Sequence, residues 1–414
     1  MSADYPTSGP TESSRPSVAP VQPLFDDVRR IAVLRGGGLG DFIFALAAID
    51  SLAAAYPDAR ITLLGTPMHA ALLASRPSSI DEVVELPVAH GVRELAGRAP
   101  DEAELDAFFE RMRSERFDLA VQVHGGGRNS NPFLLRLGAR HTVGLRTPDA
   151  PALERDMAYI YYQHEVLRSL EVVGLAGAVP VRLEPVIHAT DQERAGSSTH
   201  LDEGAYGLAL IHPGATDPRR RWPTTRFAEV AAGLAAEGTQ VIVVGDGTDV
   251  ATADEIVRLA ASATAVAPEG GAPVGHISSL AGLLSLGELV GIIDRADVLI
   301  GNDSGPRHLA QAVGVSTVGV YWVGNLINAG PLGRSRHRAH LSWTTNCPAC
   351  GVDITQVGWT AERCEHDDSV VAAVPSSPVL DDAIELRDRS IRSRSTIADR
   401  RGQGAHQGQE SSSA

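Results

Sequence analysis

The stretch from residue 31 to residue 49 restricts most strongly how this chain can fold. The apolar run at 31–34 is typical of a buried parallel strand, and the apolar run at 42–49 predicts a helix. Between them lies the glycine-rich sequence Arg-Gly-Gly-Gly-Leu-Gly-Asp at 35–41. Such a turn brings backbone N–H groups close to a ligand at the carboxyl edge of a sheet. We expect Asp41 at or just before the helix N-terminus, where the helix dipole favours a carboxylate and a cleft lies within its reach.

Alternation of strands and helices continues through two successive parts of the chain. Because this alternation produces a parallel sheet covered by helices, we predict an α/β fold with two doubly wound units rather than one enlarged sheet. A chain of 414 residues is also longer than a domain with one hydrophobic core usually is. The predicted strands are 31–34, 59–65, 83–86, 118–123, 206–214, 239–245, 298–301 and 316–321, and the predicted helices are 42–55, 68–75, 101–115, 166–173, 226–237, 252–263 and 305–314.

Changes in composition predict where the domains begin and end. The first residues are rich in Ser, Pro and Thr, and the last are rich first in Arg and Ser and then in Gly, Gln and Ser, so neither end can bury enough apolar surface to order itself. Between about 145 and 200 the periodic pattern loosens, and 180–199 is typical of a connector. We predict a disordered segment at 1–25, a first domain at 26–190, a second at 191–387 and a disordered tail at 388–414.

Charge and cysteine content exclude several classes of protein. The formal net charge of -15 argues against a nucleic-acid binder, whose phosphate contacts need a basic surface. No apolar run is long enough to span a bilayer, and the first residues lack the basic and apolar regions of a secretory signal. The 3 cysteines argue against a disulfide framework. We therefore predict a cytoplasmic protein.

The glycine-rich turn does not match a dinucleotide fingerprint. That fingerprint needs a third glycine at its sixth position, where this chain has Asp41, and an acidic residue at the end of the next strand. The next strand ends in Leu-Gly-Thr at 64–66, without a carboxylate. This disfavours a dehydrogenase. A purely structural turn with Asp41 as a helix cap explains the glycines but not the anion-binding loops described next.

A second loop, at 212–223, follows a predicted strand and contains three adjacent arginines before Trp-Pro. One guanidinium group can donate two hydrogen bonds to phosphate oxygens at once, so arginines above the carboxyl edge of a sheet suit a diphosphate. Thr216 adds a hydroxyl donor. The alternative is a solvated run of charges.

The third motif, at 301–310, is a strand-to-helix turn with the sequence Gly-Asn-Asp-Ser-Gly-Pro-Arg-His-Leu-Ala. A proline near a helix start is favourable, and the N–H groups of Ser304 and Gly305 are expected to point at a phosphate. His308 falls in the first helical turn, within reach of Asp303 or of a ligand. A lone histidine here would more often be structural.

Together the three motifs resemble glycosyltransferase family 9, the heptosyltransferases of lipopolysaccharide core synthesis and their relatives, over about residues 30–385. The resemblance implies a GT-B fold, in which two Rossmann-like domains face each other across a cleft. It implies that the domain at 26–190 binds the acceptor and the domain at 191–387 binds the sugar nucleotide.

The resemblance also implies roles for individual residues. Asp41 would be the general base. Arg220, where the family commonly has Lys, would contact the donor diphosphate, together with the turn at 303–305. Asp249 would meet the ribose, with Asp246 as a competitor. The full set of expected site residues is Asp41 as catalytic, Thr216, Arg220, Asp249, Asp303, Ser304, Gly305 and His308 for the donor, and Gly38, Gly40 and Arg128 on the acceptor side.

The implied reaction is an inverting transfer of a heptose-like sugar from a nucleotide diphosphate sugar, with ADP-heptose as the first choice, to a hydroxyl of a glycolipid or glycan. The expected partners are this donor, this acceptor and peripherally the inner face of the membrane, and no metal is expected in the reaction. Two alternatives stay open: a GT-B protein that binds a sugar nucleotide without catalysis, and a nucleotide-sugar epimerase.

The cysteines form a fourth group with a histidine: Cys347, Cys350, Cys364 and His366. Cys-x-x-Cys with a further Cys and His is the ligand set of a tetrahedral structural zinc site. The single residue between Cys364 and His366 is tight compared with usual ligand spacings. Free thiols and a redox-sensitive pair are the open alternatives.

Overall fold

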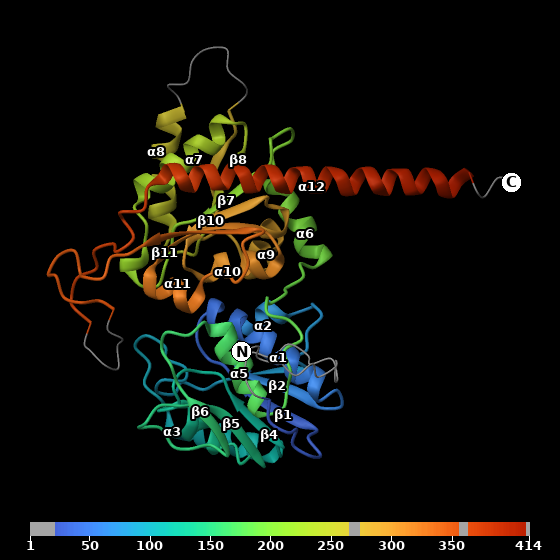
Figure 1. Ribbon diagram of the computed structural model, residues 1–414, viewed down its shortest axis with the longest axis vertical. Coiled ribbons are helices and arrows are strands. Elements are labelled where there is room, and N and C mark those ends of the chain that lie inside the picture. Colours follow the sequence, from blue (N-terminus) through green and yellow to red (C-terminus); the bar gives the residue numbers. More distant parts are fainter. Residues whose placement is uncertain (1–20, 265–273, 356–362, 411–414) are drawn as a thin grey trace, which may run out of the picture.

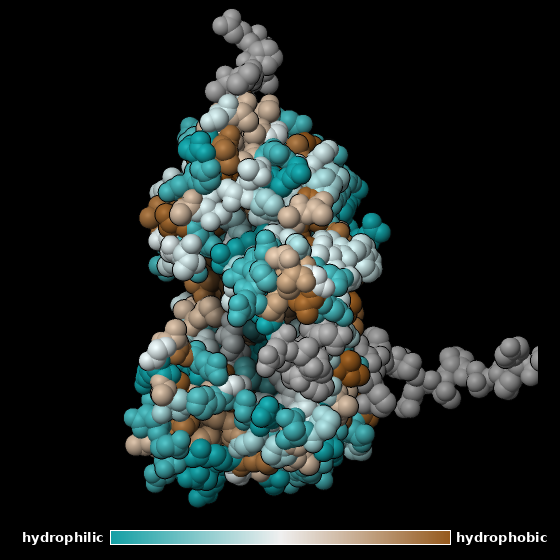
Figure 2. Space-filling model, turned by 90° about the vertical axis from the view of Figure 1, so that its left-hand side faces the viewer, coloured by the Kyte–Doolittle hydropathy of each residue, from teal (hydrophilic) through white to brown (hydrophobic). Residues whose placement is uncertain are grey.

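A computed structural model describes residues 21–264, 274–355 and 363–410 of this protein, with residues 397–410 described by their backbone alone. The chain forms two α/β domains, which lie one above the other in Figure 1. The surface narrows between the two domains, and hydrophilic and apolar residues are mixed over the face shown in Figure 2. Among the described helices, none is both long and apolar enough to cross a membrane.

The first domain is built on a parallel sheet with the strand order β3-β2-β1-β4-β5-β6. Helices cover both of its faces. The strands are β1 (Arg30–Leu34), β2 (Arg60–Gly65), β3 (Glu82–Glu85), β4 (Leu119–Gln122), β5 (His141–Arg146) and β6 (Arg155–Ala158), and the helices are α1 (Leu39–Ala55), α2 (Pro67–Leu73), α3 (Glu102–Ser114), α4 (Ser130–Leu135) and α5 (Glu165–Leu175).

The second domain repeats this topology, with the order β12-β11-β10-β7-β8-β9 in a parallel sheet. Its strands are β7 (Leu208–His212), β8 (Gln240–Val243), β9 (Ile277–Ser279), β10 (Val298–Asn302), β11 (Ser316–Trp322) and β12 (His337–Ser342). Its helices are α6 (Asp191–Ser197), α7 (Thr224–Ala236), α8 (Val250–Thr264), α9 (Leu286–Arg295), α10 (Gly305–Val313), α11 (Val323–Ala329) and α12 (Ser376–Glu410).

The central strands explain the apolar runs in the sequence. β1 lies between β2 and β4, and helices cover both faces of the sheet there, so residues 31–34 are fully buried and need apolar side chains throughout. β7 and β10 occupy the corresponding place in the second sheet. In each sheet the strand order reverses at this central pair, which opens a crevice at the carboxyl ends of the strands. The glycine-rich turn and both phosphate-binding candidates start from these ends.

The two domains meet through the N-terminal ends of α1 and α10. A Cβ atom placed on Gly40 would lie 3.1 Å from His308 Cδ2, and one on Gly305 would lie 3.0 Å from Leu39 Cβ. Behind these glycines, apolar side chains of α1 and α2 pack against α10 and α9. The glycines therefore let two strand-to-helix turns approach each other at the bottom of the interdomain cleft.

Every predicted strand and helix is present within three residues of its predicted ends. The strands β5, β6, β9 and β12 were not predicted, nor were helices α4, α6, α9, α11 and α12. β6 and β9 are short, partly exposed edge strands, and their parallel neighbours β5 and β8 supply the pairing that their own sequences do not signal. The predicted connector at 180–199 contains α6, which packs on α9.

The structure describes part of each terminal segment that was predicted to be disordered. Residues 1–20 lie outside the described residues, but Phe25 is buried, stacks on His141 and lies beneath the guanidinium of Arg155. At the other end, α12 continues through the predicted tail from 388 to 410 and extends beyond the body of the molecule in Figure 1. Its first half is anchored because Arg387 is buried and Arg394 pairs with Asp297, which lies between α9 and β10.

Candidate active site

A cleft of about 850 Å³ lies between the two domains, at the carboxyl ends of both sheets. Its size suits a nucleotide sugar, since ligand pockets commonly measure about 300–1,000 Å³. Ten of the eleven expected site residues line it: Gly38, Gly40, Asp41, Thr216, Arg220, Asp249, Asp303, Ser304, Gly305 and His308. Residues that are far apart in the sequence thus meet at one place.

Asp41 occupies the first turn of α1 and projects into the cleft with 52% of its side chain exposed. Its Oδ2 accepts the backbone N–H of Gly38 at 3.1 Å, and its Oδ1 lies 3.1 Å from Arg35 Nη2. Gly37 has a φ of +92°, and a Cβ there would lie 2.8 Å from the Asp41 carboxylate. The glycine turn therefore makes room for the carboxylate and also holds it.

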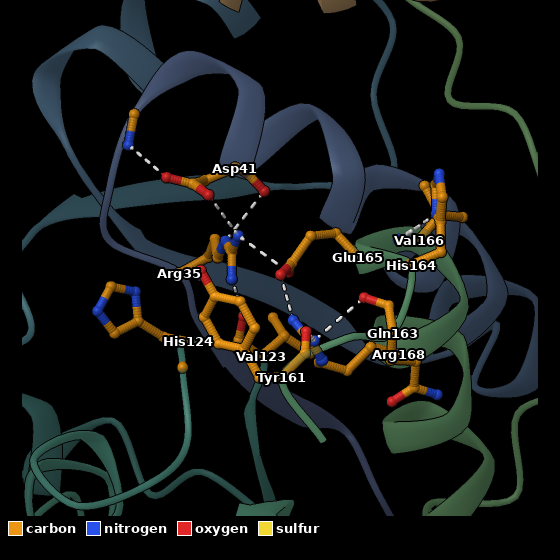
Figure 3. Close-up of polar contacts among 12 residues, drawn as sticks. Arg35, Asp41, Val123, His124, Tyr161, Gln163, His164, Glu165, Val166 and Arg168 are labelled. Atoms are coloured by element: carbon orange, nitrogen blue, oxygen red, sulfur yellow. Dashed lines mark hydrogen bonds and ion pairs between the residues drawn. The ribbon is translucent and has the colours of Figure 1, made fainter. Parts of the chain in front are cut away.

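Arg35 connects Asp41 to a second carboxylate, that of Glu165 (Figure 3). The buried guanidinium of Arg35 donates to the Asp41 backbone carbonyl and to Val123 O, and lies 3.8 Å from Glu165 Oε2. Arg168, also buried, pairs with Glu165 from the other side. Arg35 and Glu165 were not predicted as site residues. The position of Arg35 between a buried strand and a glycine run was the available signal, whereas Glu165 lies in a region with no motif.

Arg220 projects into the cleft from the second domain, and Asp303 holds it. Arg220 Nη1 lies 3.1 Å from Asp303 Oδ2, and the other oxygen, Oδ1, lies 2.9 Å from His308 Nε2 and 3.5 Å from Arg307 Nη2. Burial opposes ionisation of Asp303, but the His308 hydrogen bond and the Arg307 and Arg220 charges outweigh it and lower its pKa to about 2. Asp303 is therefore an anion between two arginine cations, and Arg220 keeps N–H groups for a ligand.

His308 is held in one orientation at the start of α10. Burial and the charge of Arg307 lower its pKa, so the ring is neutral near pH 7. The Asp303 carboxylate can only accept, so the Nε2–H of His308 donates to its Oδ1 at 2.9 Å. His308 thus positions Asp303 and also lines the cleft.

The N-terminus of α10 faces the same cleft. Ser304 is its N-cap residue and lies against His212, with Oγ 3.0 Å from Nδ1. The Ser304 side chain makes no capping bond, and Pro306 has no N–H. The Gly305 amide and the positive end of the helix dipole can therefore receive an anion from the cleft.

Comparison with known proteins identifies this arrangement. The family model described as glycosyltransferase family 9 (heptosyltransferase) matches residues 105–355. This chain belongs to glycosyltransferase family 9. It is therefore an enzyme that transfers a sugar, and the epimerase and non-catalytic alternatives lose their support.

Relatives and solved structures agree with this assignment. The transferase is 26% identical over 305 residues to lipopolysaccharide heptosyltransferase 2 of Salmonella typhimurium, covering 70% of this chain and 82% of the relative. The family 9 glycosyltransferase structure from Veillonella parvula matches with a TM-score of 0.65 and 19% identity, over 87% of this chain and 97% of that chain. The Escherichia coli ADP-heptose heptosyltransferase II structure has the same TM-score and identity, over 87% and 99%. The predicted GT-B fold is confirmed.

Two acidic residues of the transferase compete for the expected ribose contact. Asp249 is largely enclosed: Cβ atoms on Gly214 and Gly245 would lie 2.5 Å and 2.6 Å from its side chain, and its Oδ2 lies 3.5 Å from His212 Nε2. Asp246 is less enclosed, and its Oδ1 accepts the N–H and hydroxyl of Thr248, each at 2.7 Å. Both line the cleft.

Apolar side chains line the part of the cleft beside these acids. Leu284, Leu286 and Leu289 are half-buried and come from the start of α9, a region in which no motif was predicted. A flat, apolar nucleobase needs such a surface. Isolated leucines carry no sequence signal for this role, because only the fold brings them to the cleft.

Arg128 is the one expected residue outside the cleft lining. It lies in the loop between β4 and α4, its side chain is 77% exposed, and its Nε lies 3.5 Å from Asp149 Oδ2. Its role on the acceptor side stays a prediction.

The cysteines and His366 lie together in the transferase, outside the cleft. The sulfur atoms of Cys347, Cys350 and Cys364 and a ring nitrogen of His366 all lie within 4.8 Å of one another. A Cys₃His group is thus present despite the tight spacing of Cys364 and His366, and none of its members lines the interdomain cleft.

Proposed function

We propose that this transferase moves a heptose from ADP-heptose to a hydroxyl of a lipopolysaccharide-type acceptor, with inversion at the anomeric carbon. One observation carries the proposal: the carboxylate of Asp41 on the first domain and the cationic Arg220 and α10 N-terminus on the second line one cleft. The names of the relatives, which are lipopolysaccharide heptosyltransferases, support the donor sugar and the acceptor class.

The donor diphosphate would bind to Arg220 and to the amide groups at the start of α10. A guanidinium fork suits phosphate oxygens, and Asp303 holds this one in place from behind. Ser304 and Gly305 would add backbone donors, and the exposed Thr216 would add a hydroxyl. In this arrangement Asp303 acts through Arg220, since its negative charge would repel the phosphates. His308 acts by holding Asp303 in place.

The nucleoside would extend from the diphosphate toward the start of α9. The leucines at 284, 286 and 289 offer an apolar surface for adenine. Either Asp249 or Asp246 would accept a ribose hydroxyl. Asp249 is the predicted partner, although its closer enclosure makes Asp246 the more accessible of the two.

Asp41 would act as the general base. As the acceptor oxygen attacks the anomeric carbon, its proton passes to the Asp41 carboxylate, the bond to the diphosphate breaks, and the nucleoside diphosphate leaves with the electron pair. Arg220 and the α10 N-terminus stabilise the charge on this leaving group. A positioned base contributes roughly 10²–10⁴-fold to a rate, and charge stabilisation is often the larger contribution.

Gly38 and Gly40 would let the acceptor approach Asp41, because side chains there would narrow the cleft. The acceptor would extend over the first domain, in the direction in which Arg128 is predicted to act. A glycolipid acceptor places the transferase at the inner face of the membrane, as a peripheral protein.

A panel of nucleotide sugars tests the proposal. ADP-heptose should raise the melting temperature more than other ADP- and UDP-sugars do, because a ligand at a hundred times its Kd adds about 2.7 kcal/mol to stability. With a heptose-deficient core glycolipid, the enzyme should release ADP and form one new glycosidic bond. The proposed donor would be overturned if a different nucleotide sugar stabilised the enzyme and served as its donor while ADP-heptose did neither.

A further inference from the structure

The Cys₃His group has the geometry of a closed metal site. Four ligand atoms around one tetrahedral zinc, with bonds of about 2.3 Å to sulfur, lie about 3.8 Å apart. The corresponding atoms of Cys347, Cys350, Cys364 and His366 lie within 4.8 Å of one another. All four ligand positions would come from the protein, which is typical of structural rather than catalytic metal sites.

Backbone hydrogen bonds fix the turn that carries Cys347 and Cys350. Gly351 has a φ of +75°, and its N–H donates to Cys347 O at 2.9 Å, while the Cys347 N–H donates to Val352 O at 2.8 Å. These bonds close a turn in which the sulfur atoms of Cys347 and Cys350 lie within 4.8 Å of each other, so that one metal ion can contact both.

We propose that Cys347, Cys350, Cys364 and His366 bind one tetrahedral thiophilic metal ion, zinc or iron. Three thiolates and an imidazole select this class of ion over magnesium or calcium, which prefer oxygen ligands. The metal joins two segments of the second domain, the turn at 347–351 and the segment at 363–370.

The second of these segments supports the arginine loop, which is the loop at 212–223 with three adjacent arginines. Val370 N–H donates to Arg219 O at 2.8 Å, and Ser369 Oγ donates to Arg221 O at 2.6 Å. Arg363 Nη2 lies 3.6 Å from Asp217 Oδ1. These contacts lie on both sides of Arg220, so the metal site braces the loop that carries it. This step rests on the proposed function, because it takes Arg220 as the diphosphate ligand.

The same part of the chain also contacts the first domain. The Tyr162 hydroxyl donates to Thr355 O at 2.5 Å, only a few residues beyond the cysteine turn. In Figure 1 this orange-red segment between β12 and α12 lies beside both domains. The metal would thus help to set the position of a segment that contacts both sides of the cleft.

Elemental analysis of the full chain, purified without chelators, tests the metal. We expect about one zinc or one iron ion per chain, and the element found identifies the ion. Cobalt substituted for it should show the strong visible bands of tetrahedral coordination with thiolate charge transfer. Less than a tenth of an ion per chain, or a disulfide between Cys347 and Cys350, would overturn the proposal, as would several irons with inorganic sulfide.

Variants separate ligation from a general loss of structure. Cys350→Ser and His366→Ala change exposed residues and should lower metal content at least tenfold after dialysis against a weak chelator. His366→Cys supplies a fourth thiolate and should keep the ion. His276→Ala is the matched control, because that side chain is 64% exposed and lies outside the group. Equal metal loss in the control, or none in Cys350→Ser, would contradict the assignment.

The bracing role has its own test. Cys350→Ser should raise the donor KM several-fold, with less change in the acceptor KM. Ser369→Ala should keep the metal and raise the donor KM by a smaller factor, since it removes one support of the arginine loop. Metal loss with an unchanged donor KM would refute the brace. Metal content is measured without any reaction, so failure of the proposed transferase reaction would not be mistaken for failure of the metal site.

Discussion

Asp303 Oδ2 lies 3.1 Å from Arg220 Nη1, although the two residues are separated by 83 positions in the chain. Asp303 is buried and Arg220 reaches into the cleft, so the contact joins the β10–α10 turn to the arginine loop after β7. The other Asp303 oxygen faces His308 and Arg307. The carboxylate therefore orients the cation that would meet a diphosphate, which is a different task from binding the phosphates itself.

Replacing Arg220 tests this placement. Arg220→Ala should lower kcat/KM for the donor by roughly 10- to 100-fold, because a hydrogen bond to a charged group is worth about 1.5–3 kcal/mol. Arg220→Lys keeps the charge but not the paired geometry, and should lose less than Arg220→Ala. Steady-state kinetics with donor and acceptor varied separately provide the measurement. An effect confined to acceptor affinity would place the diphosphate elsewhere.

Removing the charge of Asp303 should affect stability as well as donor binding. Asp303→Asn leaves Arg307 and Arg220 without their buried counter-ion. Removing one partner of a buried ion pair lowers the free energy of unfolding by about 3 kcal/mol. We expect a lower urea midpoint with an unchanged m-value, and a higher donor KM. Arg220→Ala serves as the comparison, because it should raise the donor KM without a similar loss of stability.

Asp41 and Glu165 both line the cleft, and their amide variants distinguish the base from its support. Asp41→Asn should lower kcat by roughly 10²–10⁴-fold while the donor Kd stays nearly constant. Glu165→Gln should have a smaller effect on kcat, since Glu165 acts through Arg35 and Arg168. If Glu165→Gln were the more damaging change and Asp41→Asn turned over normally, the two roles would have to be exchanged.

The burial of His69 should make the stability of the protein depend on pH. It is fully buried and stacks on Phe42, and burial together with the charge of Arg35 lowers its pKa to about 4. As pH falls, the His69 ring is protonated at about pH 6.5 in the unfolded chain but only near pH 4 in the folded chain. The stability that the neutral His69 ring contributes to the folded state is therefore fully present above pH 6.5 and is lost as pH falls toward 4. The loss amounts to about 3 kcal/mol at most.

Urea unfolding at several pH values measures this contribution as the difference between wild type and His69→Asn. The asparagine oxygen can accept the Thr66 N–H that His69 Nδ1 accepts at 3.1 Å, so the local turn is preserved. The variant should show a flatter stability profile between pH 6.5 and 4. Parallel profiles for the two proteins would show that His69 is not the group responsible.

Two glycines provide a matched pair that tests the packing of the turn after β1. A Cβ on Gly36 would lie 2.1 Å from Val92 O, whereas a Cβ on Gly247 would have no neighbour within 4 Å. Gly36→Ala should lower the free energy of unfolding by at least about 1–3 kcal/mol, the usual cost of overpacking. Gly247→Ala should change it little. Comparable unfolding midpoints for the two variants would show that the turn after β1 can move.

Sequence periodicity was sufficient for the central strands β1, β7 and β10, but it missed the buried strand β5 and the amphipathic helix α9. β1, β7 and β10 are continuous apolar runs because neighbouring strands and helices cover them completely. β6 and β9 have no such run, and they exist because β5 and β8 offer them an edge. The first half of α12 is helical in a segment with disordered composition because Arg387 and Arg394 find partners on the second domain.

The sequence by itself determined the two-domain α/β fold, the family, and ten of the residues that line the cleft, because local spacing encodes glycine turns and helix starts. Only the tertiary structure decided which of these residues act directly and which hold others in place. It assigned Asp303 to Arg220, joined Asp41 through Arg35 to Glu165, and brought the leucines at the start of α9 to the cleft. These relationships depend on distances between side chains from different strands, which no short stretch of sequence contains.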